Sequence, residues 1–359
     1  MKKLFVDLAE KSYNIYFDVD FNKLCDKISE VGQYKKVLIV TDTNVERLYG
    51  AEAVRVFTAN GYDTEITRFE AGEQSKSIDT IMSICAACIE HGMDRKSLIV
   101  ALGGGVVGDM AGFAAAIYMR GIDFVQVPTT LLSQSDSSVG GKTGIDFMNA
   151  KNILGAFHQP KLVYINTSTL KTLPEREFVS GMGEVIKHGM IRNRAFFDSL
   201  VKNHDSIAAL DNSVLLDIAY TNCSIKADVV SKDEFENGLR ADLNFGHTIG
   251  HAVEAYSGFR LTHGECVGMG MLAAAHIANK RGIFSDQELK GLENVLKMYG
   301  FSLKTEISDR GAVKDIMQRD KKKSAGSLKF VLPEKIGSVF QCTDVTEKEI
   351  DEALDFIGK

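Results

Sequence analysis

The sequence has no long apolar run and no excess of basic residues, and each absence excludes a class of protein. A membrane-spanning helix needs about 18 or more consecutive apolar residues, and no stretch of this chain reaches that length. Lys and Arg number 42 against 48 Asp and Glu, a net charge of −6, so we expect no surface that holds nucleic acid by neutralising its phosphates. The N-terminal segment starts basic, but acidic residues interrupt it before the apolar core of a signal peptide forms. We interpret this segment as a first strand.

Closely spaced cysteines are also scarce. Among the six Cys, only Cys85 and Cys88 are neighbours, in a C-x-x-C arrangement. A thioredoxin-type motif places such a pair where a helix opens after a strand, whereas this pair lies well inside the helical run 77–91. We therefore interpret both as small buried apolar side chains and expect a reducing, cytoplasmic compartment.

The chain does contain enough apolar material for two domains, because 45% of its 359 residues are hydrophobic and 25% are charged. Up to residue 166, short buried-strand patterns such as 35–42 and 97–105 alternate with amphipathic stretches. This alternation predicts a doubly wound, Rossmann-like α/β domain over residues 1–166. Helical periodicity then dominates and predicts a mainly helical domain over residues 167–359, in which 327–340 alone resembles a hairpin.

A glycine turn follows the second strand pattern. Gly103, Gly105 and Gly108 satisfy G-x-G-x-x-G between a strand and a helix, the context in which a pyrophosphate approaches the backbone. The motif lies too far along the chain for a standard dinucleotide fingerprint, and a tight turn without a ligand is the alternative. Asp42, beside Asn44 at the end of the first strand pattern, can accept hydrogen bonds from a ribose or cap a helix.

The region 128–160 is dense in Thr, Ser, Gly and Lys, which suits an anion-binding surface better than a core. Lys142 and Lys151 would act there as point charges. Residues 140–144 resemble part of a Walker A loop, but that motif needs glycine where Asp136 stands. A P-loop nucleotide hydrolase is therefore not expected.

Three histidines have a spacing that suits a metal site. His247 and His251 share one helical face, His263 opens the next predicted helix, and Glu184 interrupts an apolar stripe three residues before Lys187. Two His and a carboxylate with one open position form a catalytic zinc arrangement. Structural histidines and a plain Glu–Lys pair are the alternatives, and Thr248 excludes the zincin motif, which needs Glu at that position.

These segments occur in the order and spacing of the 3-dehydroquinate synthase family of sugar-phosphate cyclases, and the resemblance covers essentially the whole chain. It rests on GGGVVGDMAGFAAAIYMRGIDFVQVPTTLLSQSDSSVGGKTGID, KNILGAFHQP, GMGEVIKHG, LRADLNFGHTIGHA and HGECV. It implies a dehydroquinate synthase-like fold, in which an NAD-binding domain (1–166) precedes a metal- and substrate-binding domain (167–359). One departure is Ala71, where the family usually carries Asp on the adenosine side.

The resemblance also implies site residues. The zinc ligands would be Glu184, His247 and His263, and cobalt is an alternative metal. NAD would contact Asp42, Asn44, Glu73, Lys76, Gly104, Gly105, Asp109, Thr129, Thr130, Lys142, Lys151, Thr169, Thr172 and Leu173. The substrate would contact Arg120, Lys151, Asn152, Lys226, Arg240, Asn244 and one lysine of 321–323, taken as Lys322. Catalytic roles would fall to Asp136, Lys142, Lys187 and His251. Arg120 is expected to reach a neighbouring subunit, which implies a homodimer.

The implied reaction converts 3-deoxy-D-arabino-heptulosonate 7-phosphate into 3-dehydroquinate and phosphate, a step of the shikimate pathway to the aromatic amino acids. It proceeds by transient oxidation with NAD, phosphate elimination, reduction and an intramolecular aldol. Two alternatives stay open: a cyclase for another sugar phosphate, and a metal-dependent alcohol or glycerol dehydrogenase that releases NADH.

Overall fold

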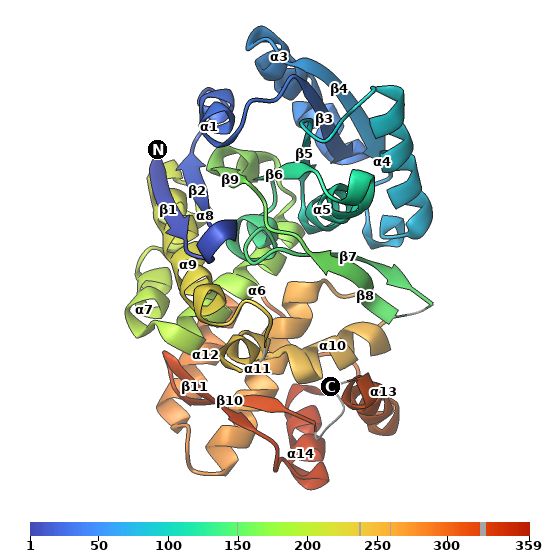
Figure 1. Cartoon of the computed structure of the whole chain (residues 1–359). Helices are drawn as coiled ribbons and strands as arrows, with labels where there is room; N and C mark the ends of the chain where they lie inside the picture. Colours follow the sequence, from blue (N-terminus) through green and yellow to red (C-terminus); the bar gives the residue numbers. More distant parts are fainter. Residues whose placement is uncertain (149, 237, 259, 324–327) are drawn as a thin grey trace. The chain divides into compact units, whose positions relative to one another are not determined.

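The chain forms two compact units that interleave along the sequence. A computed structural model describes all residues except 149, 237, 259 and 324–327, and the side chains of 319–327 are also not described. Unit 1 consists of Met1–Leu173 and Leu215–Ser231, and unit 2 consists of Pro174–Val214 and Lys232–Lys359 (Figure 1). A single division at residue 166 cannot express this arrangement, because the segment 215–231 packs with the N-terminal sheet.

Unit 1 is built on a seven-stranded sheet with the order β1-β2-β9-β6-β5-β3-β4. Its strands are β1 (Lys2–Val6), β2 (Tyr13–Asp18), β3 (Lys36–Asp42), β4 (Asp63–Phe69), β5 (Leu98–Gly103), β6 (Asp123–Pro128) and β9 (Leu162–Asn166). Only β1 pairs antiparallel, with β2, and the other pairs are parallel. The doubly wound α/β prediction is confirmed.

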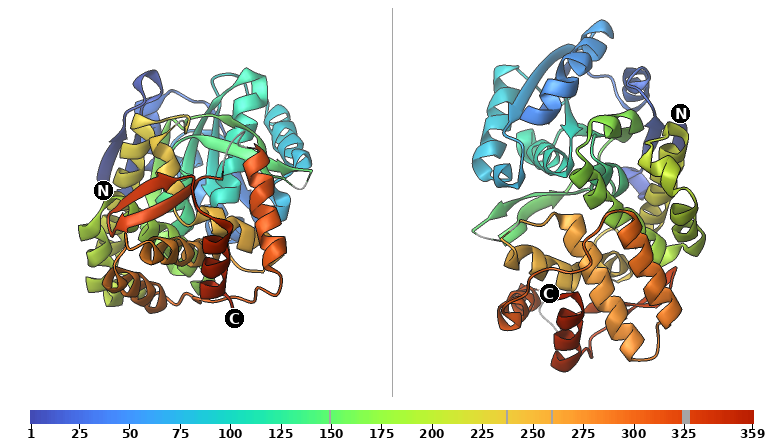
Figure 2. Two further views of the ribbon diagram at one scale, coloured as in Figure 1. Left: turned by 90° about the horizontal axis from the view of Figure 1, so that it is seen from below. Right: turned by 180° about the vertical axis from the view of Figure 1, so that it is seen from behind.

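Helices cover both faces of this sheet. They are α1 (Leu24–Val31), α2 (Thr43–Val45), α3 (Ala51–Ala59), α4 (Ile78–Glu90), α5 (Gly105–Ile117) and α9 (Asn212–Lys232). One core cluster joins α1 and α3 to side chains such as Ile39 and Val100. On the opposite face, α4 and α5 pack against side chains such as Leu38 and Ile99, and α9 packs against β2 and β9. Helices flank the strands in both turned views of Figure 2.

The polar region after β6 folds into a two-stranded hairpin that the sequence did not predict. β7 (Lys142–Phe147) pairs antiparallel with β8 (Ala150–Phe157) and packs against α5. Glycines face each other in this pair, and a Cβ on Gly155 would lie 2.1 Å from the carbonyl oxygen of Thr143. β8 exposes most of its side chains and β7 buries Thr143, Gly144 and Ile145 in a row, so no alternation marks these strands in the sequence.

Unit 2 is mainly helical, as predicted. Its helices are α6 (Glu175–Arg192), α7 (Arg194–Lys202), α8 (His204–Ala208), α10 (His247–Tyr256), α11 (His263–Lys280), α12 (Asp286–Met298), α13 (Arg310–Lys323) and α14 (Glu347–Ile357). Helix α11 is buried over most of its length and packs against α6, α10, α12 and α14.

The hairpin expected within 327–340 is present as β10 (Phe330–Lys335) and β11 (Ser338–Cys342). It packs against α11 and α6, and the left view of Figure 2 shows it lying across the helices of its unit. Within the described part of the chain, no helix combines the length and the apolar character that crossing a membrane requires.

Candidate functional site

Glycines bring the helices α6, α10 and α11 of unit 2 into backbone contact. A Cβ on Gly264 would lie 1.9 Å from the carbonyl oxygen of Ser180, and one on Gly270 would lie 1.8 Å from that of Gly246. Real Cβ atoms do not approach so closely, so only glycine permits these crossings. The close packing sets the first turns of α10 and α11 beside the middle of α6.

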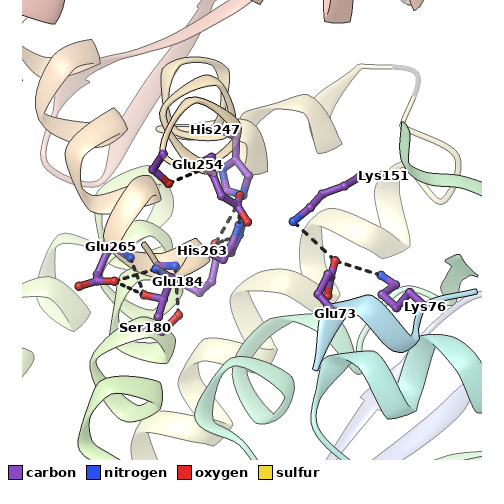
Figure 3. A network of polar contacts seen from close by, with 12 residues as sticks. Glu73, Lys76, Lys151, Ser180, Glu184, His247, Glu254, His263 and Glu265 are labelled. Carbon is purple, nitrogen blue, oxygen red and sulfur yellow. Dashed lines mark hydrogen bonds and ion pairs between the residues drawn. The ribbon is translucent and has the colours of Figure 1, made fainter. Parts of the chain in front are cut away.

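Three side chains from these helices converge on one point (Figure 3). The Nε2 atoms of His247 and His263 each lie 3.4 Å from Oε1 of Glu184. In a tetrahedral zinc site with bonds of about 2.0–2.1 Å, neighbouring ligand atoms are about 3.4 Å apart. These two separations therefore match those between ligands of a shared divalent cation.

The other ring nitrogens determine which tautomer each imidazole adopts. Nδ1 of His247 lies 3.1 Å from the carbonyl oxygen of Phe245, and Nδ1 of His263 lies 3.3 Å from Oε2 of Glu254. Both oxygens can only accept, so both Nδ1 atoms carry a hydrogen, and in the neutral form of each ring Nε2 presents a lone pair. That is the state in which histidine binds a metal.

Glu184 is 1% exposed, and among the described residues no hydrogen-bond donor serves its Oε1. Its Oε2 forms an ion pair with Lys187, one helical turn later. Burial by itself raises the pKa of Glu184, but Lys187 and His247 outweigh it and hold the pKa well below the usual range. The carboxylate is thus charged and has one oxygen directed at the two imidazoles.

The two imidazoles have different electrostatic surroundings. Burial and the nearby Lys187 lower the pKa of His247. Burial also disfavours the charged form of His263, but Glu184 and Glu254 outweigh it and raise the pKa to about 9. His263 therefore has two carboxylates beside it, Glu184 and Glu254, whereas the carboxylate beside His247 is Glu184.

His251 is the third imidazole of this group. Its ring centroid lies 5.0 Å from that of His247 and 5.6 Å from that of His263. One ligand atom from each of the three rings falls within 4.8 Å of the others, although His251 is exposed. The ring therefore lies beside the two proposed metal ligands.

In unit 1, the predicted NAD residues follow the carboxyl ends of the parallel strands. After β3 the chain adds β4 on one side of it and then β5 on the other side, so the order of strand addition reverses at β3. Asp42 ends β3, Gly104 and Gly105 follow β5, Thr129 follows β6, and Thr169 follows β9. Open α/β sheets bind ligands at such a switch point.

The glycine turn is suited to an anion. Helix α5 begins after Gly104 without a side-chain cap, so its first N–H groups have no such acceptor. A Cβ on Gly104 would lie 3.1 Å from the Thr130 side chain, and a Cβ on Gly105 would lie 3.1 Å from the Ser137 side chain, so there is little room for a larger residue at either position. Thr129 is 4% exposed, and among the described residues its Oγ1 has no partner. Of the two roles considered for Asp42, the structure displays the helix cap, since Oδ1 accepts from the N–H groups of Asn44 and Val45.

A buried lysine connects residues that are predicted to bind NAD with the β7–β8 hairpin. Nζ of Lys76 donates to Oδ2 of Asp109 at 2.8 Å and to Oδ1 of Asn152. Burial lowers the pKa of Lys76, but Asp109 and Glu73 outweigh it, and the pKa is raised. Glu73 also lies 3.5 Å from Nζ of Lys151 (Figure 3). Lys76 therefore stays charged.

The remaining predicted residues of unit 1 are placed as follows. Asp136 pairs with Lys226 of α9 at 2.8 Å, and Lys226 is 6% exposed. Thr172 Oγ1 donates to the carbonyl oxygen of Thr169, and Leu173 ends this segment. Lys142 opens β7 and is exposed, and Arg120 is exposed in a turn with φ +70°.

Two predicted substrate residues of unit 2 contact the segment around residue 235. Arg240 is 2% exposed and donates to the carbonyl oxygen of Glu234. Asn244 Nδ2 donates to Oε1 of Glu236 at 2.9 Å. The side chain of Lys322 lies outside the described residues.

Comparison with known proteins decides the family. The family model described as 3-dehydroquinate synthase N-terminal matches residues 66–180, and the one described as 3-dehydroquinate synthase C-terminal matches residues 181–323. A 3-dehydroquinate synthase of Acetivibrio thermocellus is 47% identical over 360 aligned positions, which cover 100% of both chains. This chain belongs to the 3-dehydroquinate synthase family.

Two solved cyclases have the same fold as this family member. A 2-epi-5-epi-valiolone synthase of Streptomyces hygroscopicus with NAD⁺ and Zn²⁺ bound has a TM-score of 0.90 and 26% identity, and the match covers 98% of each chain. A 2-deoxy-scyllo-inosose synthase complexed with carbaglucose-6-phosphate, NAD⁺ and Co²⁺ has a TM-score of 0.87 and 25% identity, with 98% of this chain and 99% of that one covered.

Sequence reasoning missed Glu254, the carboxylate on Nδ1 of His263. A signal was available, because His251 and Glu254 follow His247 at positions i+4 and i+7 of one helix. The three side chains must share a face. The partner helix could not be identified from that spacing, since the His263 contact is formed between helices.

Proposed function

We propose that this chain converts 3-deoxy-D-arabino-heptulosonate 7-phosphate into 3-dehydroquinate and phosphate, as an NAD- and metal-dependent, phosphate-eliminating lyase of the shikimate pathway in the cytoplasm. The proposal rests on one observation above the rest. Within a family of this activity, two imidazole Nε2 atoms lie at the same 3.4 Å from one buried carboxylate oxygen. That arrangement is suited to a cation that also binds substrate hydroxyls.

Zinc, or cobalt in its place, would be held by Glu184, His247 and His263, and NAD by the strand ends of unit 1. The two solved cyclases with this fold contain NAD⁺ together with Zn²⁺ or Co²⁺, which supports both assignments. When bound, the metal would lower the pKa of hydroxyls ligated to it, and NAD would supply reversible hydride transfer with no net oxidation.

The protein's own groups would bind the two ends of the substrate. Lys142, Lys151, Asn152 and Asn244 are assigned to the phosphate, and Lys226 and Arg240 to the carboxylate. The buried Arg240 guanidinium can bind a carboxylate through two parallel hydrogen bonds. A phosphate fixed in this way can itself remove the neighbouring proton, because it is held within reach.

Proton movement near the metal would use Lys187, His251 and Asp136. Lys187 already contacts the Glu184 carboxylate, and the exposed ring of His251 can exchange protons with water. After elimination and reduction, the ring of the sugar opens and an intramolecular aldol closes the carbocycle.

We also propose a homodimer in which Arg120 contributes to the substrate site of the partner subunit. Arg120 and the preceding Met119 both have positive φ, at +70° and +49°. Such conformations are costly for residues with side chains and are retained mainly at functional positions, which supports a role for this turn.

The test combines the purified full chain with NAD, zinc and the heptulosonate phosphate. We expect phosphate and dehydroquinate in equal amounts, with no accumulating NADH absorbance. His263→Ala should abolish turnover, and His91→Ala, a histidine outside the proposed site, should leave it unchanged. Full activity after zinc removal, or steady NADH release, would contradict the proposal.

A cyclase for another sugar phosphate is the second candidate, favoured by the TM-score of 0.90 to the valiolone synthase. Sedoheptulose 7-phosphate and glucose 6-phosphate carry no carboxylate, so a buried Arg240 would have no partner in such a substrate. Phosphate release from those sugars, with none from the heptulosonate, would favour the second candidate.

A further inference from the structure

Glu254 lies on the same helix face as a metal-ligand candidate and contacts the neighbouring one. It follows His247 by seven residues on α10, and its side chain is buried at 6% exposure. Its Oε2 lies 3.3 Å from Nδ1 of His263, which opens α11. Figure 3 shows the Glu254 side chain beside the histidine rings.

The two imidazoles are therefore oriented by different kinds of acceptor. His247 donates to a neutral carbonyl, that of Phe245, two residues earlier on its own chain segment. His263 donates to a charged side chain from another helix. A carboxylate behind a metal-bound imidazole fixes the ring, makes its other nitrogen a better donor and adds negative charge near the cation.

We infer that Glu254 is a positioning residue that raises metal affinity through His263, whereas Nδ1 of His247 is held by a backbone carbonyl. The inference rests on the metal site of the proposed function. The competing interpretation is structural: Glu254 would only join α10 to α11, and its loss would affect stability without acting through one ligand.

A double-mutant cycle in zinc affinity separates these interpretations. The metal-stripped full chain is titrated with Zn²⁺ against a chromophoric chelator, and the apo thermal midpoint is recorded for each variant. Glu254→Gln preserves shape and an acceptor oxygen, and we expect it to weaken zinc binding by about 10- to 100-fold. In a His263→Ala background the same change should have almost no effect, whereas in a His247→Ala background the full factor should persist.

Glu265→Gln is the matched control. Glu265 lies in the first turn of α11, forms a capping box with Thr262 and pairs with Arg176 at 3.2 Å. Gln keeps an acceptor oxygen for the box but removes the charge, so the change should lower the thermal midpoint slightly and leave zinc affinity unchanged. Equal effects of Glu254→Gln in both histidine backgrounds, or none in the parent chain, would overturn the inference while leaving the metal site intact. Failure of the parent chain to bind zinc at all would instead reject the metal part of the proposed function.

Discussion

At the scale of single residues, the feature that needs explanation is a lysine buried beside a metal-ligand candidate. Lys187 is 1% exposed and pairs with Glu184, which is equally buried. A carboxylate taken out of water costs several kcal/mol unless a positive charge accompanies it. Lys187 provides that charge before a cation binds, so the site can fold without its metal.

We therefore predict that Lys187→Met lowers the unfolding free energy of the metal-free chain by about 3–5 kcal/mol, because it leaves a buried charge uncompensated. Zinc should restore part of the loss, so its stabilising effect should be larger in the variant than in the parent. Urea unfolding with and without Zn²⁺ measures both quantities. The exposed Lys202→Met is the control and should change neither; equal zinc effects in parent and Lys187→Met would refute the explanation.

At the scale of helices and strands, the site depends on how closely α6 and α11 approach. Gly264 makes this close approach possible, because any side chain at that position would clash with the Ser180 carbonyl. The contact lies next to His263 in the chain, so a change in helix spacing moves a proposed ligand away from Glu184. Packing of backbone on backbone thus determines the geometry of the polar atoms.

Gly264→Ala should consequently lower stability by about 1–3 kcal/mol through overpacking and weaken zinc binding as well. Gly291→Ala on α12 is the matched control: its nearest neighbour would be Ile336 at 3.8 Å, an ordinary contact. That change should stabilise the chain by up to about 1 kcal/mol, the usual gain of alanine over glycine in a helix. Thermal unfolding and the zinc titration read out both variants, and tight zinc binding by Gly264→Ala would count against this account.

Elements with a buried, periodic pattern were predictable from the sequence, and those without it were not. The β-branched run of β3 and the strand–glycine–helix passage of β5 and α5 have local signals that the structure confirms. The β7–β8 hairpin has one largely exposed strand, one strand buried at three consecutive residues and backbone-to-backbone glycine contacts, which leave no apolar alternation to detect. Helix spacing placed His247 and His251 on one face, but the approach of Glu184 and Glu254 arises from packing between helices.

At the scale of the whole molecule, unit 1 is completed by a helix from the middle of the chain. Ala219, Cys223 and Ala227 of α9 pack on Ile15 and Val163 of the sheet. The same helix also holds the turn that carries Asp136. Lys226 forms an ion pair with Asp136, and Nδ2 of Asn222 donates to the carbonyl oxygen of Ser135. No periodicity within α9 reveals which sheet it covers, so sequence alone placed it with its helical neighbours.

A fragment of residues 1–173 should therefore fail to reach the native state, because one apolar face of β2 and β9 stays uncovered. We expect it to bind a hydrophobic dye strongly and to unfold without a cooperative transition, unlike the full chain. Circular dichroism during a urea titration tests this. A sharp transition, together with slow amide exchange in β2 and β9, would mean that α9 is dispensable for the sheet.

The interleaving also has a consequence for the order of events during synthesis. Domains usually fold as units, N-terminal first, as they leave the ribosome, yet here the sheet has to wait until residue 231 has emerged. The residues 174–214 appear in the interval and belong to the other unit. All seven strands of the sheet in unit 1 have thus been synthesised before the helix that completes its core. During this interval the nascent chain exposes an uncovered face of the sheet, to which chaperones would bind.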